Sequence, residues 1–335
     1  MKMDYEKFKE WAKDNIGYFL PEKFDGADVD FARMIRPGVA YDAMTVRSPE
    51  TNAAPAINLE DMYGRYKNGA SLYDVGQMMA SIAQTETPKI SAKMFSDYEA
   101  IKDKLFVRVN NIEKNAELLS HCPHIKVGDM AITYSIQLDQ DGGSLMSTTI
   151  NNDLLNSMGV DKDTLHRDAM ANSQKIMPLE AKSMSELMGI HDENHPSSNV
   201  MVVTNDIKVD GAAAIFYPGE MEKMAERIGS YYMCPSSIHE TILVPDHMGD
   251  NESLSQTVSS VNDSAVIPEE RLSNTVYHYD AKEKVFEKAS DYEKRIEGLT
   301  YNDRKYKIDL TEDNNDSQHE RSEIHFEDHP MKMRM

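Results

Sequence analysis

A chain of 335 residues can bury a sizeable core, as one large domain or as two smaller ones. Its 57 acidic and 36 basic residues give a net charge of −21, and a field of that sign repels phosphate backbones, so direct nucleic-acid binding is not expected. Hydrophobic residues make up 40% and charged residues 28%, which is typical of a globular protein. No apolar run approaches the roughly 20 residues that span a bilayer, and no membrane association is expected.

Two cysteines, Cys122 and Cys234, are too few for a disulfide framework. The residues after Met1 contain no apolar signal core. A reducing, bacterial-type cytoplasm is therefore the simplest location to predict. The 23 methionines are scattered, and we expect them to fill the core rather than to bind copper or heme.

The first quarter of the chain switches between helical and extended patterns. The expected elements are a helix over 5–19, strands over 29–35, 43–46 and 55–59, and a second helix from residue 71. Pro21 ends the first helix, and Pro55 confines its strand to a sheet edge because proline cannot donate to a ladder. Ser71 with Asp74 three residues later approximates a capping box, which predicts where the second helix begins.

The middle of the chain predicts a hairpin flanked by helices. The expected elements are a strand over 105–109, a helix over 112–119, hairpin strands over 130–138 and 145–150, and helices over 154–158 and 161–176. Gly142 and Gly143 permit the positive φ angles of the hairpin turn. Asp161 is the expected N-cap of the last helix, and Pro178 follows its end.

Residues 199–246 form the most clearly patterned block. The expected order is a buried strand over 200–203, a turn at Asp210-Gly211, a strand over 212–217, a helix over 221–228 and further strands ending near Val244. A helix over 254–261 and a strand over 275–280 follow. Residues 310–335 are rich in Asp, Glu, Asn and His and contain almost nothing to bury.

These elements predict an α+β fold with mixed or antiparallel sheets and packed helices. The expected organisation is an N-terminal block over 1–180, a C-terminal block over 198–290 and a flexible acidic tail over 300–335. The two blocks are alternatively one continuous domain.

The run Pro235-Ser236-Ser237-Ile238-His239-Glu240 contains the catalytic candidates Ser236, Ser237, His239 and Glu240. A hydrolase needs a serine beside a base and the base beside an orienting carboxylate. In a strand Ser237 and His239 would share one face and Glu240 would lie on the other, so a carboxylate from another segment would be required. The alternative is a structural turn before a strand.

Three clusters contain metal-ligand side chains: His121-Cys122-Pro123-His124, His191 to His195, and His325 with His329. None has the convergent spacing of a zinc site, so neither a metal site nor another cofactor is predicted. The sequence contains no phosphate-binding loop and no glycine-rich dinucleotide fingerprint.

The sequence from Asn205 to Pro245 contains Lys208-Val209-Asp210-Gly211-Ala212-Ala213-Ala214-Ile215 and the Pro-Ser-Ser-Ile-His-Glu run. With the segments 98–115, 124–134 and 276–280, it resembles an uncharacterised bacterial domain-of-unknown-function family of gut anaerobes over residues 3–290. The segment 148–173 also resembles a second uncharacterised bacterial family. The first family has no known activity, and the resemblance implies a link to mobile genetic elements.

Three functions remain open. A non-catalytic accessory or protein-interaction protein is favoured, because no complete catalytic constellation is visible and an acidic tail can bind a basic partner. A small-molecule hydrolase using Ser236 or Ser237 with His239 is the second. The third is an acidic nucleic-acid mimic, which requires carboxylates aligned on one face at the spacing of phosphates, about 3.4 Å per strand.

Overall fold

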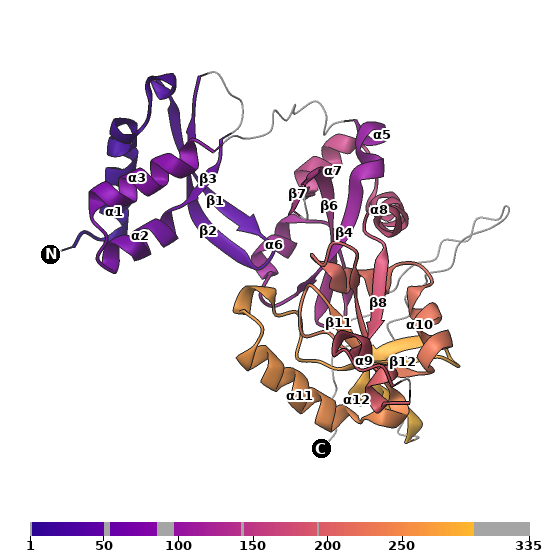
Figure 1. Cartoon of the computed structure of the whole chain (residues 1–335). Coiled ribbons are helices and arrows are strands. Elements are labelled where there is room, and N and C mark those ends of the chain that lie inside the picture. The colour runs from indigo at the N-terminus through magenta and orange to yellow at the C-terminus, as the bar shows by residue number, and fades with distance from the viewer. Residues whose placement is uncertain (1, 50–53, 86–96, 142–143, 193, 298–335) are drawn as a thin grey trace, which may run out of the picture.

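The computed structural model describes residues 2–49, 54–85, 97–141, 144–192 and 194–297 and shows an α+β protein with three sheets (Figure 1). Every described strand pair is antiparallel, so the predicted fold class is confirmed. No helix among the described residues is long and apolar enough to cross a membrane. The expected flexible tail, residues 300–335, lies outside the described residues.

Residues 2–85, which we call the N-terminal unit, combine a three-stranded sheet with helices on one face (Figure 1). Its elements are α1 (Tyr5–Asn15), η1 (Ile16–Phe19), η2 (Glu22–Phe24), β1 (Asp28–Arg36), β2 (Val39–Arg47), β3 (Ala56–Asn58), α2 (Leu59–Lys67) and α3 (Leu72–Ala83), where η denotes a 3₁₀ helix. The sheet order is β1-β2-β3. The capping box of Ser71 and Asp74 is confirmed at the start of α3. Helix α2 was not predicted.

The second sheet has the strand order β4-β6-β5, with β7 also paired to β6. The elements of this region are α5 (Tyr98–Ile101), η3 (Lys102–Lys104), β4 (Leu105–Asn111), α6 (Ala116–His121), β5 (His124–Val127), β6 (Met130–Asp141), β7 (Ser144–Thr149), α7 (Asn152–Met158) and α8 (Lys162–Ile176). The predicted β6–β7 hairpin is confirmed, with a register shift between Gln137 and Asp139. Asp161 caps α8 as expected.

The third sheet has six strands in the order β13-β12-β10-β11-β9-β8. Its strands are β8 (Leu179–Ser183), β9 (Met201–Asn205), β10 (Tyr231–Cys234), β11 (Thr241–Pro245), β12 (Tyr277–Asp280) and β13 (Val285–Lys288). The helices around it are α9 (Met184–Leu187), η4 (Pro196–Ser198), η5 (Gly211–Phe216), α10 (Glu220–Ile228), η6 (Asp246–Met248), α11 (Asn251–Ser264), η7 (Pro268–Glu270) and α12 (Ala289–Ile296).

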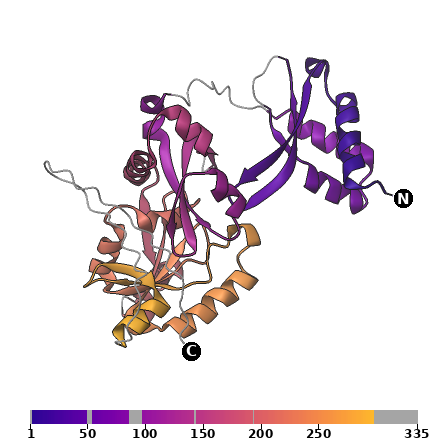
Figure 2. The ribbon, with the colours of Figure 1, turned by 180° about the vertical axis from the view of Figure 1, so that it is seen from behind.

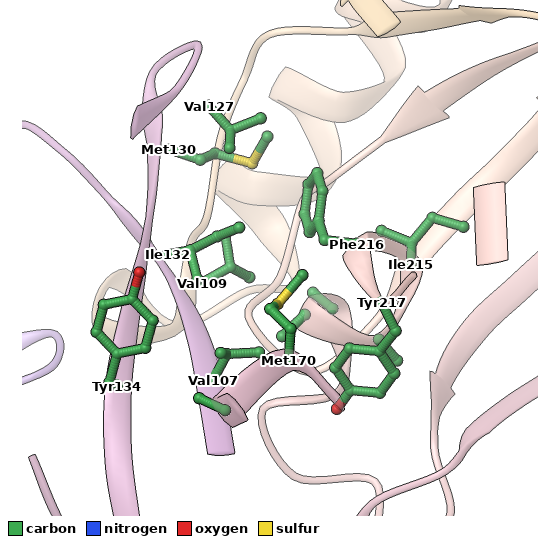
Figure 3. Packing of buried hydrophobic residues seen from close by; sticks show 14 of the residues in the cluster. Val107, Val109, Val127, Met130, Ile132, Tyr134, Met170, Ile215, Phe216 and Tyr217 are labelled. Carbon is green, nitrogen blue, oxygen red and sulfur yellow. The ribbon is translucent and has the colours of Figure 1, made fainter. Parts of the chain in front are cut away.

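The second and third sheets share one hydrophobic core, and residues 97–297 are called the main unit here. Figure 3 shows Val107 and Ile132 of the second sheet beside Met170 of α8 and the apolar residues of η5. Core residues range from Tyr98 to Phe286, so the division expected between residues 180 and 198 falls inside this core. A separate core, which includes Phe8, Met44 and Met79, lies within the N-terminal unit.

The expected strand over 212–217 is wrong, because this run forms the 3₁₀ helix η5. All six residues of η5 are buried, three of them are alanines, and a short apolar run cannot be assigned to strand or helix by periodicity. Asp210 precedes it in a left-handed conformation, with φ +55°, which turns the chain out of β9. The last strand of the block also begins later than expected, at Thr241, so 235–240 is a loop.

The two units meet where the turn between β1 and β2 lies against α6 and η7. The N–H of Gly38 donates a 2.7 Å hydrogen bond to Oδ1 of Asn115, just before α6. A β-carbon added to Gly38 would lie 2.6 Å from the carbonyl oxygen of Glu269. The tip of the hairpin reaches the main unit beside α6 in both views (Figures 1 and 2).

Candidate functional site

The Pro235–Glu240 run is a loop between β10 and β11 that main-chain hydrogen bonds hold from two sides. On one side, Leu272 N–H donates to Ser236 O at 3.0 Å, and Ile238 N–H donates to Glu270 O at 2.9 Å. On the other, Ala212 N–H of η5 donates to Ile238 O at 3.1 Å. The loop is therefore fixed between the η7 turn and the start of η5.

The serines and Glu240 do not assemble around the imidazole of His239. Ser236 is buried, with 8% of its surface exposed, and Glu240 is exposed at the start of β11. Ser237 Oγ accepts a 3.0 Å hydrogen bond from the main-chain N–H of His239. This bond stabilises the turn of the main chain between Ser237 and His239.

The imidazole of His239 is held instead by two residues from other segments. Its Nδ1 is 3.2 Å from the main-chain N of Asp210, whose N–H can only donate. Nδ1 is therefore the acceptor, and in the neutral ring Nε2 carries the proton. Nε2 lies 3.3 Å from Oε1 of Glu270, within ion-pair distance of that carboxylate. A carboxylate from another segment does reach His239, but no ring nitrogen remains to take a proton from Ser237.

Asp210 extends this arrangement to the second sheet. Its Oδ2 lies 2.6 Å from Nε of Arg108 on β4, and both side chains are 14% exposed. The guanidinium also donates to Ser135 Oγ at 3.2 Å and to Ser147 Oγ at 3.0 Å. We call Arg108, Asp210, His239 and Glu270 the polar network, which links β4, the start of η5, the 235–240 loop and η7.

The backbone around Asp210 is strained, and a buried side chain holds it in place. Lys208 and Asp210 both have positive φ angles, +57° and +55°, which are uncommon for residues other than glycine. The side chain of Asn205, fully buried, donates to Val209 O at 2.7 Å and accepts from Val209 N–H at 3.2 Å. Strain of this kind persists where surrounding contacts determine the conformation, and it often occurs at functional sites.

Only part of this network could be predicted from the sequence. His239 was a candidate, and Asp210-Gly211 was recognised as a turn, but Arg108 and Glu270 were missed. Arg108 interrupts the apolar strand Leu105–Val109, and a charge at such a position needs a buried partner. That partner, Asp210, is 102 residues away, and a spacing pattern cannot reveal such a pair.

The metal-ligand clusters have local roles in the structure. No group of three His, Cys, Asp or Glu side chains could hold a metal ion within the part of the chain that the structure describes. His124 Nδ1 bonds to the carbonyl of Cys122 at 2.9 Å, and His195 Nδ1 to Ser197 Oγ at 2.7 Å in the turn that starts η4. Glu193, His325 and His329 lie outside the described residues.

The fold and this network define an α+β protein whose described residues form three clusters of buried hydrophobic side chains, with the polar network beside the largest. Residues 5–281 match the model of a family of unknown function (DUF5688). The chain belongs to this family, as the resemblance over residues 3–290 predicted. Comparisons with curated proteins and with solved structures found no match.

Proposed function

We propose that this protein is a non-catalytic interaction protein that binds an extended segment of a partner protein along strand β1. The observation that carries the proposal is the free edge of β1. This strand has nine residues, and among the described strands it pairs only with β2. An unpaired edge presents main-chain donors and acceptors to which another chain can add a strand.

The exposure of β1 supports this use. The four consecutive residues from Asp30 to Arg33 are exposed, although successive residues of a strand normally alternate between a covered and an open face. Phe31 has 39% of its surface exposed at the centre of the strand. Charged residues at both ends, Asp28 and Arg36, are the usual protection against indiscriminate pairing and would select the partner.

The polar network favours this proposal over a hydrolase. Catalysis by Ser237 would need a free nitrogen of His239, and both nitrogens are engaged. The hydrolase alternative would require Nδ1 of His239 to leave Asp210 N–H, or the ring to change tautomer, first. We therefore assign the network a role in holding the loops together.

We also propose a cytoplasmic location without direct nucleic-acid binding. Cys122 and Cys234 are free and buried, as expected for thiols in a reducing compartment. Burial raises the pKa of Cys122 to about 11 and that of Cys234 to about 12, so neither is a reactive thiolate at neutral pH.

Site-specific photocrosslinking in the native host tests the interaction. A photoreactive phenylalanine replaces Phe31, and Tyr73 on α3, which is 65% exposed, provides the matched control position. We expect a defined crosslinked protein from position 31 and none from position 73. The crosslink should disappear in an Ala32→Lys background, because a charge on the edge strand opposes pairing. Equal crosslinking from both positions, or none from either, would contradict the proposal.

A further inference from the structure

The turn between β1 and β2 touches the same short helix that supplies the carboxylate to His239. Gly38 lies against the main chain of Glu269, and the next residue, Glu270, contacts Nε2 of His239 at 3.3 Å. The tip of the N-terminal unit and the imidazole of the main unit therefore contact adjacent residues of η7. The N-terminal unit is therefore connected to the polar network through η7.

Contacts from different parts of the molecule hold the two ends of η7. Beyond η7, main-chain hydrogen bonds from Leu272 to Ser236 and from Ser273 to Pro235 attach the chain to the 235–240 loop. At its start, Lys114 Nζ donates to Pro268 O at 2.9 Å. The hairpin tip covers the middle of η7 at Glu269. Main-chain hydrogen bonds from Ile238 N–H to Glu270 O and from Glu270 N–H to Ile267 O also hold Glu270. Removal of the tip would thus leave the main chain of Glu270 attached by these two bonds, without the contact on its neighbour Glu269.

The contact at Gly38 is specific in its geometry. Gly38 has φ +78°, and any β-carbon there would meet a main-chain oxygen, which cannot move aside as a flexible side chain can. Its N–H donates to Asn115, which is 6% exposed and whose Nδ2 donates to Asn111 O at 2.9 Å. The acceptor is therefore held in position before the hairpin docks.

We propose that the β1–β2 turn is a latch: while it is docked on Asn115 and Glu269 it keeps the side chain of Glu270 on Nε2 of His239, and its release lets that side chain leave Nε2. This inference goes beyond the proposed function, since it concerns the contact between the units and needs no partner. In the docked state Asp210 N–H at Nδ1 sets the Nε2–H tautomer, and the Glu270 carboxylate lies on Nε2. In the released state the Glu270 carboxylate no longer covers Nε2, which is then open to a reagent.

The test is the rate at which diethyl pyrocarbonate modifies His239 in the full-length chain, followed by peptide mass spectrometry at neutral pH. Gly38→Ala should release the latch. Gly26→Ala is the matched control, since Gly26 has φ +75° and a β-carbon there would meet nothing within 4 Å. Both variants place alanine at nearly the same positive φ, so the difference between them reports the docking contact.

We expect His239 to react several-fold faster in Gly38→Ala than in Gly26→Ala, and Glu270→Ala to show the same acceleration. His195, which is bonded to Ser197, should react equally in all variants. His278 is 0% exposed, so its modification would show that a variant has unfolded. If Gly38→Ala unfolds in this way, Asn115→Ala is used as the releasing variant instead. Equal rates for His239 in the folded releasing variant and in Gly26→Ala would overturn the latch.

Discussion

The main chain of α3 at Gly76 lies directly on the ring of Phe19: a β-carbon at Gly76 would be 2.4 Å from Cζ of that ring. Gly64 in α2 is also helical, but a β-carbon there would meet nothing within 4 Å. Replacement of Gly64 by alanine therefore tests helix propensity alone, whereas replacement of Gly76 also tests the packing against Phe19.

We predict opposite effects when each of these glycines is replaced by alanine. Gly64→Ala should stabilise the N-terminal unit by up to about 1 kcal/mol, because alanine is the better helix former. Gly76→Ala should destabilise it by roughly 1–3 kcal/mol, because the added methyl group overpacks the Phe19 contact. Urea unfolding followed by the fluorescence of Trp11, which packs against this core, measures both changes. A stabilised Gly76→Ala protein would show that η1 can move aside.

The separate core of the N-terminal unit leads to a second prediction. Its buried residues run from Phe8 to Ala83, and none belongs to the core of the main unit. We therefore expect a fragment of residues 1–85 to fold alone and to unfold cooperatively, although a domain of this size has only a small margin of stability. Dispersed amide signals in its NMR spectrum would verify this. A disordered fragment would show that the unit depends on its docking through Gly38.

The sequence predicted most helices and strands because their signals are local. The α3 capping box and the β6–β7 hairpin each depend on residues close together in the chain. The strand assignment for residues 212–217 failed because an alanine-rich buried run has no periodicity that separates a 3₁₀ helix from a strand.

The candidate site was predicted less completely, for a physical reason. His239 was found because a histidine beside serines is a local pattern, but its real partners are Asp210 and Glu270. Their approach depends on how the loops before η5 and within η7 pack against each other. Contacts between side chains of different loops depend on the tertiary structure, and the spacing of residues in one sequence does not predict them.

The ion pair of Arg108 and Asp210 predicts a graded series of stabilities. Arg108→Met leaves the Asp210 carboxylate, 14% exposed, without its partner and should destabilise the fold by about 3–5 kcal/mol. Asp210→Asn should be milder than Asp210→Ala, since asparagine tolerates the left-handed backbone at φ +55° and alanine does not. Combining Arg108→Met with Asp210→Asn should recover part of the loss.

Guanidinium chloride unfolding of the two single variants and the double variant measures this coupling as a double-mutant cycle. Additive effects would mean that the 2.6 Å contact contributes little to stability and that Arg108 acts mainly through Ser135 and Ser147.

The buried imidazole of His278 predicts a loss of stability in mild acid. His278 is fully buried in β12, its ring stacks on Tyr292 at 3.5 Å, and neither ring nitrogen has a hydrogen-bond partner. Burial lowers its pKa below the ordinary 6.5, while Asp246, 3.8 Å from Nε2, and Asp280 oppose this shift and Arg295 adds to it. Between the lowered pKa and 6.5, His278 is therefore protonated in the unfolded chain and neutral in the folded chain.

This difference in protonation determines the direction in which stability changes with pH. Below pH 6.5 the unfolded state takes up the proton first, so the free energy of unfolding falls as the pH falls, until the lowered pKa of the folded state is reached. One such group changes stability by at most about 1.4 kcal/mol per pH unit. His278→Phe keeps a ring against Tyr292 and removes the titration, so its stability should fall less steeply between pH 6.5 and 5. Because burial also lowers the pKa of His166 to about 4, some slope should remain.

Chemical unfolding at closely spaced pH values measures both slopes, with the exposed His247→Gln as the control that should match the unmodified protein. If His278→Phe and the unmodified protein lost stability in parallel, then His278 would be accepting its proton within the fold. The Asp246 carboxylate is the group placed to stabilise that charge, since it is 3.8 Å from Nε2 and partly exposed at the start of η6. In that case Asp246→Asn should make the free energy of unfolding fall steeply below pH 6.5, because the protonated His278 would lose the carboxylate that stabilises its charge.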